Sequence, residues 1–160
     1  MSNDVFFRDN RRELFGTKDK IKNAHRSLGR AQSTQERELV NEEIINLHAE
    51  KNKHLKSVIR NTIARNNQTD TIYKKIDLHG LTKEEVEVFF PEYMDTQKQR
   101  LQSGYKEVHR FEVVTGRGNN SIGEPVLKPY VQEYLDDNGI QNVLGYGGGS
   151  FVVTLYKQDT

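Results

Sequence analysis

Apolar residues recur at helical spacing in the first 70 residues and at strand spacing after them. Gln32 to Arg65 carries an apolar series on one side of a predicted long helix, preceded by Ser33 and Thr34 as candidate N-caps. The series comprises Leu39, Ile44, Leu47, Leu55, Ile59 and Ile63. An earlier helix is predicted over Phe6 to Leu28, ending near Gly29, because glycine suits a helix C-terminus. The two helices would form a hairpin whose apolar stripe packs on its own chain or binds a partner.

The second half alternates between strand and helix patterns. Strands are predicted over Tyr73 to Leu78, Val108 to Thr115, Asn142 to Tyr146 and Phe151 to Tyr156, and helices over Thr82 to Ser103 and Pro125 to Asn138. The order is β-α-β-α-β-β. We therefore predict an α/β fold with a four-stranded mixed sheet and an N-terminal helical extension.

Local signals mark the helix ends of this half. Thr82 with Glu85, and Ser121 with Glu124, have the spacing of a capping box, and Gly139 marks the end of the last helix.

Two prolines affect these helices. Pro91 predicts a kink or break near Phe90, because proline removes an N–H and clashes with the preceding turn. Pro129 is compatible with a helix that begins around Lys128, since proline is tolerated in the first turn.

Composition supports the same division and excludes several functions. The 160 residues include no Cys, which excludes disulfides, thiol catalysis and thiolate zinc sites. Residues 1–70 carry 14 basic and 10 acidic side chains, a formal +4, and residues 71–160 carry 10 and 13, a formal −3. We assign 1–70 to a helical extension and 71–160 to the α/β domain. No apolar run reaches the roughly 20 residues of a membrane span, so we expect a soluble, intracellular protein.

Two polar clusters should meet at one edge of the sheet. The first two strands should be parallel and joined by a right-handed crossover, so their carboxyl ends lie on the same edge, where α/β sheets bind ligands. Asp77, His79 and Gly80 stand at the first end. The second end is followed by Thr115, Gly116, Arg117, Gly118 and Asn119.

These residue types suit an anionic ligand. Strand alternation makes Asp77 and His79 neighbours on one face, and a carboxylate can orient an imidazole and raise its basicity. Gly116 and Gly118 allow a tight turn with exposed N–H groups before a helix N-terminus, and Arg117 offers a charged fork to phosphate. A third glycine-rich stretch, which contains Tyr146 and Gly148, could border the same crevice, with Tyr146 stacking on a base. Each element alone also has a purely structural interpretation, as a hydrogen-bonded histidine, a turn or a hairpin connection.

The sequence Asp77-Leu78-His79-Gly80, followed by Thr115-Gly116-Arg117-Gly118, a helix and a glycine-rich turn, resembles the Smr (small MutS-related) family over about residues 73–157. The N-terminal region is similar to the helical domain that often precedes Smr in eukaryotic proteins. The resemblance implies a two-layer α/β domain and endonuclease activity, on DNA or RNA, and in several eukaryotic members on messenger RNA of stalled or collided ribosomes. It also implies that Asp77, His79 and Arg117 are catalytic.

The leading hypothesis is RNA cleavage that requires no metal or other cofactor. His79 would act as general base on a 2′-hydroxyl, Asp77 would orient it, and Arg117 with the loop amides would stabilise the transition state. His109 is a weaker candidate for the acid. The alternatives are a non-catalytic nucleic-acid or ribosome-binding module and a metal-assisted DNA nickase.

The net charge of the α/β domain indicates how it would encounter RNA. With a formal −3, the α/β domain has little general attraction for phosphate, so free RNA should bind weakly. We expect the ribosome to present the strand, with the basic N-terminal half helping, and hence a cytoplasmic location in messenger RNA decay and ribosome quality control.

Overall fold

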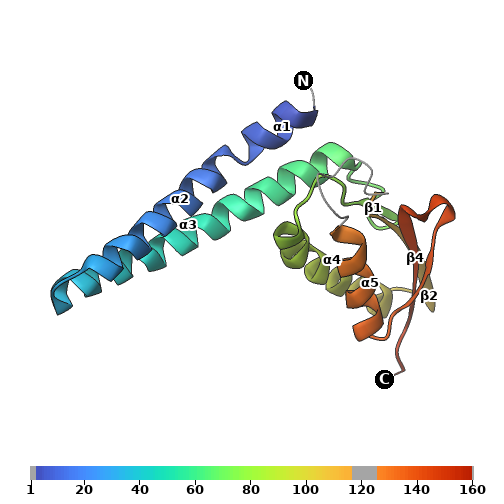
Figure 1. Ribbon diagram of the computed structural model, residues 1–160. Coiled ribbons are helices and arrows are strands. Elements are labelled where there is room, and N and C mark those ends of the chain that lie inside the picture. Colours follow the sequence, from blue (N-terminus) through green and yellow to red (C-terminus); the bar gives the residue numbers. More distant parts are fainter. Residues whose placement is uncertain (1–2, 117–125, 160) are drawn as a thin grey trace. The chain divides into compact units, whose positions relative to one another are not determined.

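The computed structural model describes residues 3–116 and 126–159, which divide into two compact units, Met1–Thr62 and Ile63–Thr160 (Figure 1). The first unit is helical. Helix α1 spans Asn3–Asn10, α2 spans Arg12–Arg30, and α3 spans Thr34–Asn66, with the last turn of α3 belonging to the second unit.

Helices α2 and α3 form the predicted hairpin, lying side by side over their length in the first unit (Figure 1). Ala24, Ile44 and Leu47 are buried between them, and Ile21, Leu28 and Val40 pack against this cluster. Ser33 is the N-cap of α3, as predicted, because its hydroxyl accepts a hydrogen bond from the Glu36 N–H at 3.1 Å. The apolar stripe in this region is therefore used within the hairpin.

Three details of the hairpin differ from the sequence prediction. The single helix over Phe6 to Leu28 is wrong, because Arg11 takes a non-helical conformation between α1 and α2. Gly29 lies inside α2 without a positive φ, and the extended Ala31 is the C-cap. Leu39 is 69% exposed, because Val40 occupies the interface position one helical turn before Ile44.

The second unit has the predicted β-α-β-α-β-β order. Its elements are β1 (Lys75–Asp77), α4 (Lys83–Ser103), β2 (Val108–Val114), α5 (Leu127–Asp137), β3 (Gln141–Leu144), the short 3₁₀ helix η1 (Tyr146–Gly148) and β4 (Ser150–Tyr156). The sheet order is β1-β2-β4-β3, with β1 parallel to β2 and the other pairs antiparallel. Helices α4 and α5 cover the same face of the sheet (Figure 1), which confirms the two-layer α/β fold.

Side chains from three strands align across the covered face of the sheet. Register places Ile76 beside Val113 and Val113 beside Phe151, and all three are fully buried. Val86 and Phe90 of α4 are equally buried. Because successive strand residues point to opposite faces, this row fixes which residues of each strand point away from the core.

Pro91 does not break α4, which runs continuously from Lys83 to Ser103. Of the two expected alternatives near Phe90, a kink or a break, the break is therefore wrong. An internal proline costs about 3 kcal/mol, but burying each large apolar side chain contributes about 1.5–3 kcal/mol. Phe90 and Met94, on either side of Pro91, are fully buried, and Tyr93 is 6% exposed, so packing of this segment offsets the cost.

Helix α5 begins and ends as the sequence predicts. Pro129 lies in its first turn. At the other end Gly139 has φ +63°, with its N–H donating to Asp136 O, while the Ile140 N–H donates to Leu135 O, the pattern of a Schellman motif. The predicted capping pair Ser121 and Glu124 lies outside the described residues.

Candidate active site

Asp77 and His79 form a hydrogen-bonded pair where β1 ends. The Asp77 Oδ1 atom lies 2.8 Å from His79 Nδ1 and also accepts the His79 backbone N–H at 3.0 Å. One carboxylate oxygen therefore orients both the main chain and the ring of the histidine. The Asp77 side chain is 24% exposed and that of His79 is 47% exposed, so the ring is open to an incoming ligand.

A tight turn holds His79 between β1 and α4. The Leu81 N–H donates to Leu78 O at 3.2 Å, and Gly80, the third residue of this turn, has φ +83°. A type II turn needs a positive φ at that position, which explains the glycine. Thr82 then begins α4 with the predicted capping box, because its hydroxyl accepts from the Glu85 N–H and the Glu85 carboxylate accepts from the Thr82 N–H.

The two strand ends meet as predicted. Asp77 is paired with Val114 in the parallel β1–β2 register, so Thr115 and Gly116 leave the sheet directly beside the Asp77–His79 pair. Gly116 has φ +83°, a backbone conformation that favours glycine. Arg117, Gly118 and Asn119, which follow, lie outside the described residues.

The glycine-rich β3–β4 connection is bonded to this loop. Thr115 and Gly116 both donate their N–H groups to Gly149 O, each at 3.1 Å. From the sequence, the loop amides were predicted to contact phosphate. These two amides instead fasten the loop to the β3–β4 connection, so their part in the site is to shape it.

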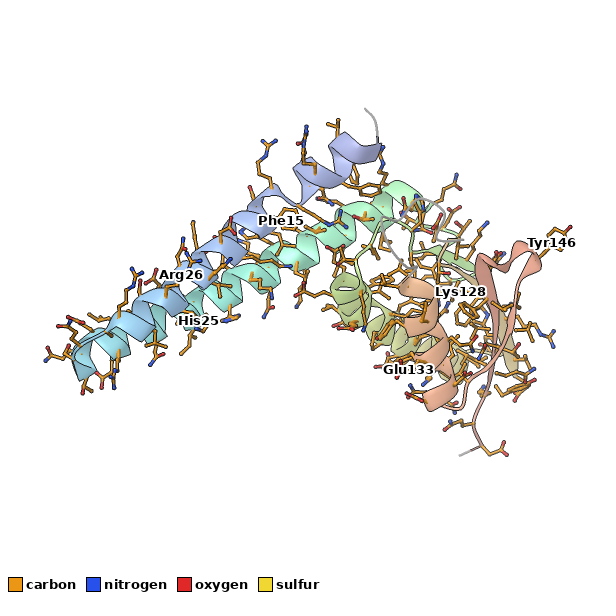
Figure 2. All side chains as sticks on the ribbon, viewed as in Figure 1. Phe15, His25, Arg26, Lys128, Glu133 and Tyr146 are labelled. Carbon is orange, nitrogen blue, oxygen red and sulfur yellow. The ribbon has the colours of Figure 1, made fainter. Side chains whose placement is uncertain are left out.

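Tyr146 lies in the β3–β4 connection, and Lys128 lies beside that connection. Tyr146 is fully exposed and projects from the β3–β4 connection (Figure 2). A Cβ atom built on Gly148, which has φ +75°, would lie 3.6 Å from Lys128 Nζ, so an ammonium group stands beside this connection. Lys128 could not be recognised from the sequence, because a lysine in the first turn of a helix gives no local signal of a ligand.

Two asparagines where α3 ends, which were not predicted from the sequence, also belong to the site. Asn67 Oδ1 accepts the Asp77 N–H at 2.8 Å, and Asn67 Nδ2 donates to Asp77 O at 3.1 Å. Asn66 Nδ2 donates to His79 O at 2.7 Å. The backbone of the Asp77–His79 segment is thus held by side chains that precede β1.

His109 is a structural residue. It stands near the start of β2, five residues before Val114, or roughly 16 Å at about 3.3 Å per strand residue. Its Nε2 lies 2.9 Å from Tyr73 O, and its ring stacks on Phe111 with centroids 5.2 Å apart. It therefore cannot serve as an acid at the Asp77–His79 pair.

Residues 3–116 and 126–159 contain neither a candidate metal site nor a candidate membrane span. No group of three or more His, Cys, Asp or Glu side chains in these ranges could hold a metal ion. None of the helices described there has the length and apolar character needed to cross a membrane.

Comparisons with known proteins identify the family. Residues 76–154 match the model of the Smr domain. The solved human small-MutS related domain is 30% identical, with the match covering 49% of this chain and 96% of that one, at a TM-score of 0.40. This chain belongs to the Smr family.

Two other solved Smr domains are similar to this family member. The Smr domain of NEDD4-binding protein 2 is 29% identical over 54% of this chain and 90% of that one, at a TM-score of 0.40. The B3BP Smr domain is 24% identical over 61% and 91%, at a TM-score of 0.47. No match was found among curated proteins. Smr domains are nuclease-like or nucleic-acid-binding modules that bind RNA or DNA, and some members have nuclease activity.

Proposed function

We propose that this Smr protein is an endoribonuclease that cleaves RNA without a metal ion. His79 Nε2 takes the proton of a 2′-hydroxyl, and the 2′-oxygen attacks the adjacent phosphorus. The bond from phosphorus to the 5′-oxygen breaks, and that oxygen leaves after taking a proton from an acid or from water. The products are a 2′,3′-cyclic phosphate and a 5′-hydroxyl.

The observation that carries the proposal is the orientation of the His79 ring. Nδ1 lies 2.8 Å from a carboxylate oxygen, and the ring is about half exposed. Because one ring nitrogen of a neutral imidazole is a donor and the other an acceptor, an N–H at Nδ1 leaves Nε2 as the base. Asp77 also stabilises the imidazolium that forms when His79 takes a proton.

The remaining residues bind the strand and its charge. Arg117 binds the phosphate and stabilises its transition state, and Lys128 adds a second cation near the β3–β4 connection. Tyr146 stacks on a base. The other proposed substrate-binding residues are Gly80, Thr115, Gly116, Gly118, Asn119 and Gly148.

The proposed substrate is messenger RNA on a stalled or collided ribosome, in the cytoplasm. The formal −3 over residues 71–160 supports recruitment by a partner, because contacts with phosphate supply most of the sequence-independent affinity for nucleic acid. The ribosome would present the strand, and the basic helical region would add to the attraction.

The test compares the full chain with His79→Ala on ribosome-bound messenger RNA and on matched RNA and DNA strands. We expect cleavage of RNA alone, with cyclic phosphate ends, unaffected by a chelator and lost in His79→Ala. Cleavage of an all-deoxy strand, or loss of activity with a chelator, would instead indicate a DNA nickase that uses a metal. Ribosome binding by both proteins without any cleavage would indicate a recruitment module.

A further inference from the structure

β1 is an edge strand, and the backbone of Asp77 faces its open side. The Leu78 N–H donates to Val114 O at 2.8 Å, and Lys74 O accepts from the Glu112 N–H at 2.9 Å, so the even-numbered residues bond to β2. In a parallel pair the alternate residue points its N–H and C=O the other way. The main chain of Asp77 therefore has no strand to pair with.

Asn67 takes the place of that missing strand. Its carboxamide offers one acceptor and one donor in the same plane, and these bond to the N–H and the C=O of Asp77 at 2.8 and 3.1 Å. The same Nδ2 donates to Ile63 O at 3.0 Å, which ties the side chain back to the last turn of α3. Both polar atoms of the carboxamide are thus satisfied, and the network determines which one is oxygen.

Asn66 holds the other end of the segment. Its Nδ2 donates to His79 O at 2.7 Å, so two consecutive side chains hold the backbone of both members of the Asp77–His79 pair. Both asparagines and the Asp77–His79 pair belong to the compact unit that begins at Ile63. The match to the Smr domain begins only at residue 76. The residues that position the pair therefore precede the part of the chain that the family model covers.

We propose that Asn67, assisted by Asn66, is a positioning residue for the Asp77–His79 pair, and that the functional Smr unit of this protein begins at the last turn of α3. Asn67 touches no substrate; it sets the Asp77 main chain so that Oδ1 reaches Nδ1 of His79. As far as catalysis is concerned, this inference rests on the proposed function. The placement of the imidazole can be tested without any activity.

The experiment uses the full chain with Asn67→Ala, and with Asn52→Ala as the control, because Asn52 is an exposed asparagine of α3, the helix that Asn67 directly follows. Nitrogen-15 NMR of the histidine rings reports which nitrogen of His79 carries the proton. We expect the Nδ1–H tautomer to dominate in the parent and in Asn52→Ala. In Asn67→Ala the population of the Nε2–H tautomer of His79 should rise, while circular dichroism and thermal unfolding show that the chain is folded.

Cleavage kinetics give the second readout. Small misplacements of a catalytic group cost up to about a hundredfold in rate, so Asn67→Ala should lower kcat by roughly ten- to a hundredfold with KM nearly unchanged. Asn66→Ala should have a smaller effect of the same kind, because it removes one hydrogen bond to the Asp77–His79 segment, whereas Asn67→Ala removes two. If the parent cleaves nothing, the proposed function fails and the tautomer decides the positioning role alone. A folded Asn67→Ala protein with the parental His79 tautomer would overturn the inference.

Discussion

One oxygen atom of the Asp77 carboxylate accepts two hydrogen bonds from a single residue, His79. Oδ1 lies 3.0 Å from the backbone nitrogen and 2.8 Å from Nδ1 of the ring. The backbone contact places the carboxylate, and the ring contact places the imidazole. The two contacts can be separated experimentally, because an amide retains an acceptor oxygen and lacks the negative charge.

Asp77→Asn should preserve the fold and reduce RNA cleavage by roughly a hundredfold or more, in the range that general-base catalysis contributes. The Asn oxygen still accepts from the His79 backbone, but the neutral amide no longer stabilises the imidazolium. The measurement is single-turnover cleavage with saturating enzyme. Asp70→Asn, a change at an exposed position before β1, should leave the rate unchanged. Equal rates for the two variants would contradict the role of Asp77.

Gly80→Ala should destabilise the protein by about 1–2 kcal/mol, because a side chain at positive φ is strained. Gly29→Ala is the matched control, since Gly29 lies in a helix with open space around it, and it should stabilise the chain by about 0.5–1 kcal/mol. Urea unfolding of both variants provides the comparison. Gly80→Ala should also slow cleavage, because His79 precedes it in the same turn. Similar stability of the two variants would show that the conformation of Gly80 is not required.

Tyr146→Ala should weaken binding of single-stranded RNA by about 1–3 kcal/mol, the usual contribution of one stacked base. Tyr105 offers a close control. It is also fully exposed, but it precedes β2, whereas the site lies beyond the carboxyl end of that strand. Tyr105→Ala should bind RNA as the parent does, in titrations followed by fluorescence anisotropy. Weaker RNA binding in both variants would indicate nonspecific contacts of exposed aromatic rings with RNA instead of a defined binding site.

Burial raises the pKa of Tyr93 well above its ordinary value, so the folded protein keeps this hydroxyl protonated. Its O–H donates to Ile72 O at 2.6 Å. The unfolded chain releases the proton near pH 10 and the folded chain does not, so Tyr93 contributes stability that is present below pH 10 and lost above it. The expected slope in that range is about 1.4 kcal/mol per pH unit from this group.

Tyr93→Phe should therefore lower the free energy of unfolding at pH 7 by about 1–3 kcal/mol, because Ile72 O loses a buried hydrogen-bond donor. It should also flatten the decline of the free energy of unfolding above pH 10. Chemical unfolding at several pH values between 7 and 11 measures both effects. An unchanged slope in Tyr93→Phe would mean that other groups cause the alkaline loss of stability.

The meeting of the two strand ends beside the Smr-like motifs could be predicted from local patterns. Asp77 and His79 stand at the end of an apolar strand pattern, and one crossover later Thr115 and Gly116 follow another. The rules for parallel connections bring such ends together, and the register of Asp77 with Val114 agrees. Pro91 shows the limit of local reasoning, because the cost of proline in a helix is visible in the sequence and the burial of Phe90 and Met94 that offsets it is not.

The sequence by itself determined the order of elements and the α/β class, because helix caps, apolar periodicity and turn glycines act over a few neighbouring positions. The two-layer arrangement followed from the resemblance of the motif residues to the Smr family. Only the tertiary structure decided that Asn67 bonds the open edge of β1 and that the Thr115 and Gly116 amides donate to Gly149 O. An asparagine after a helix looks the same in a linker or beside a strand edge. Its role depends on which unpaired backbone groups the completed sheet leaves within its reach.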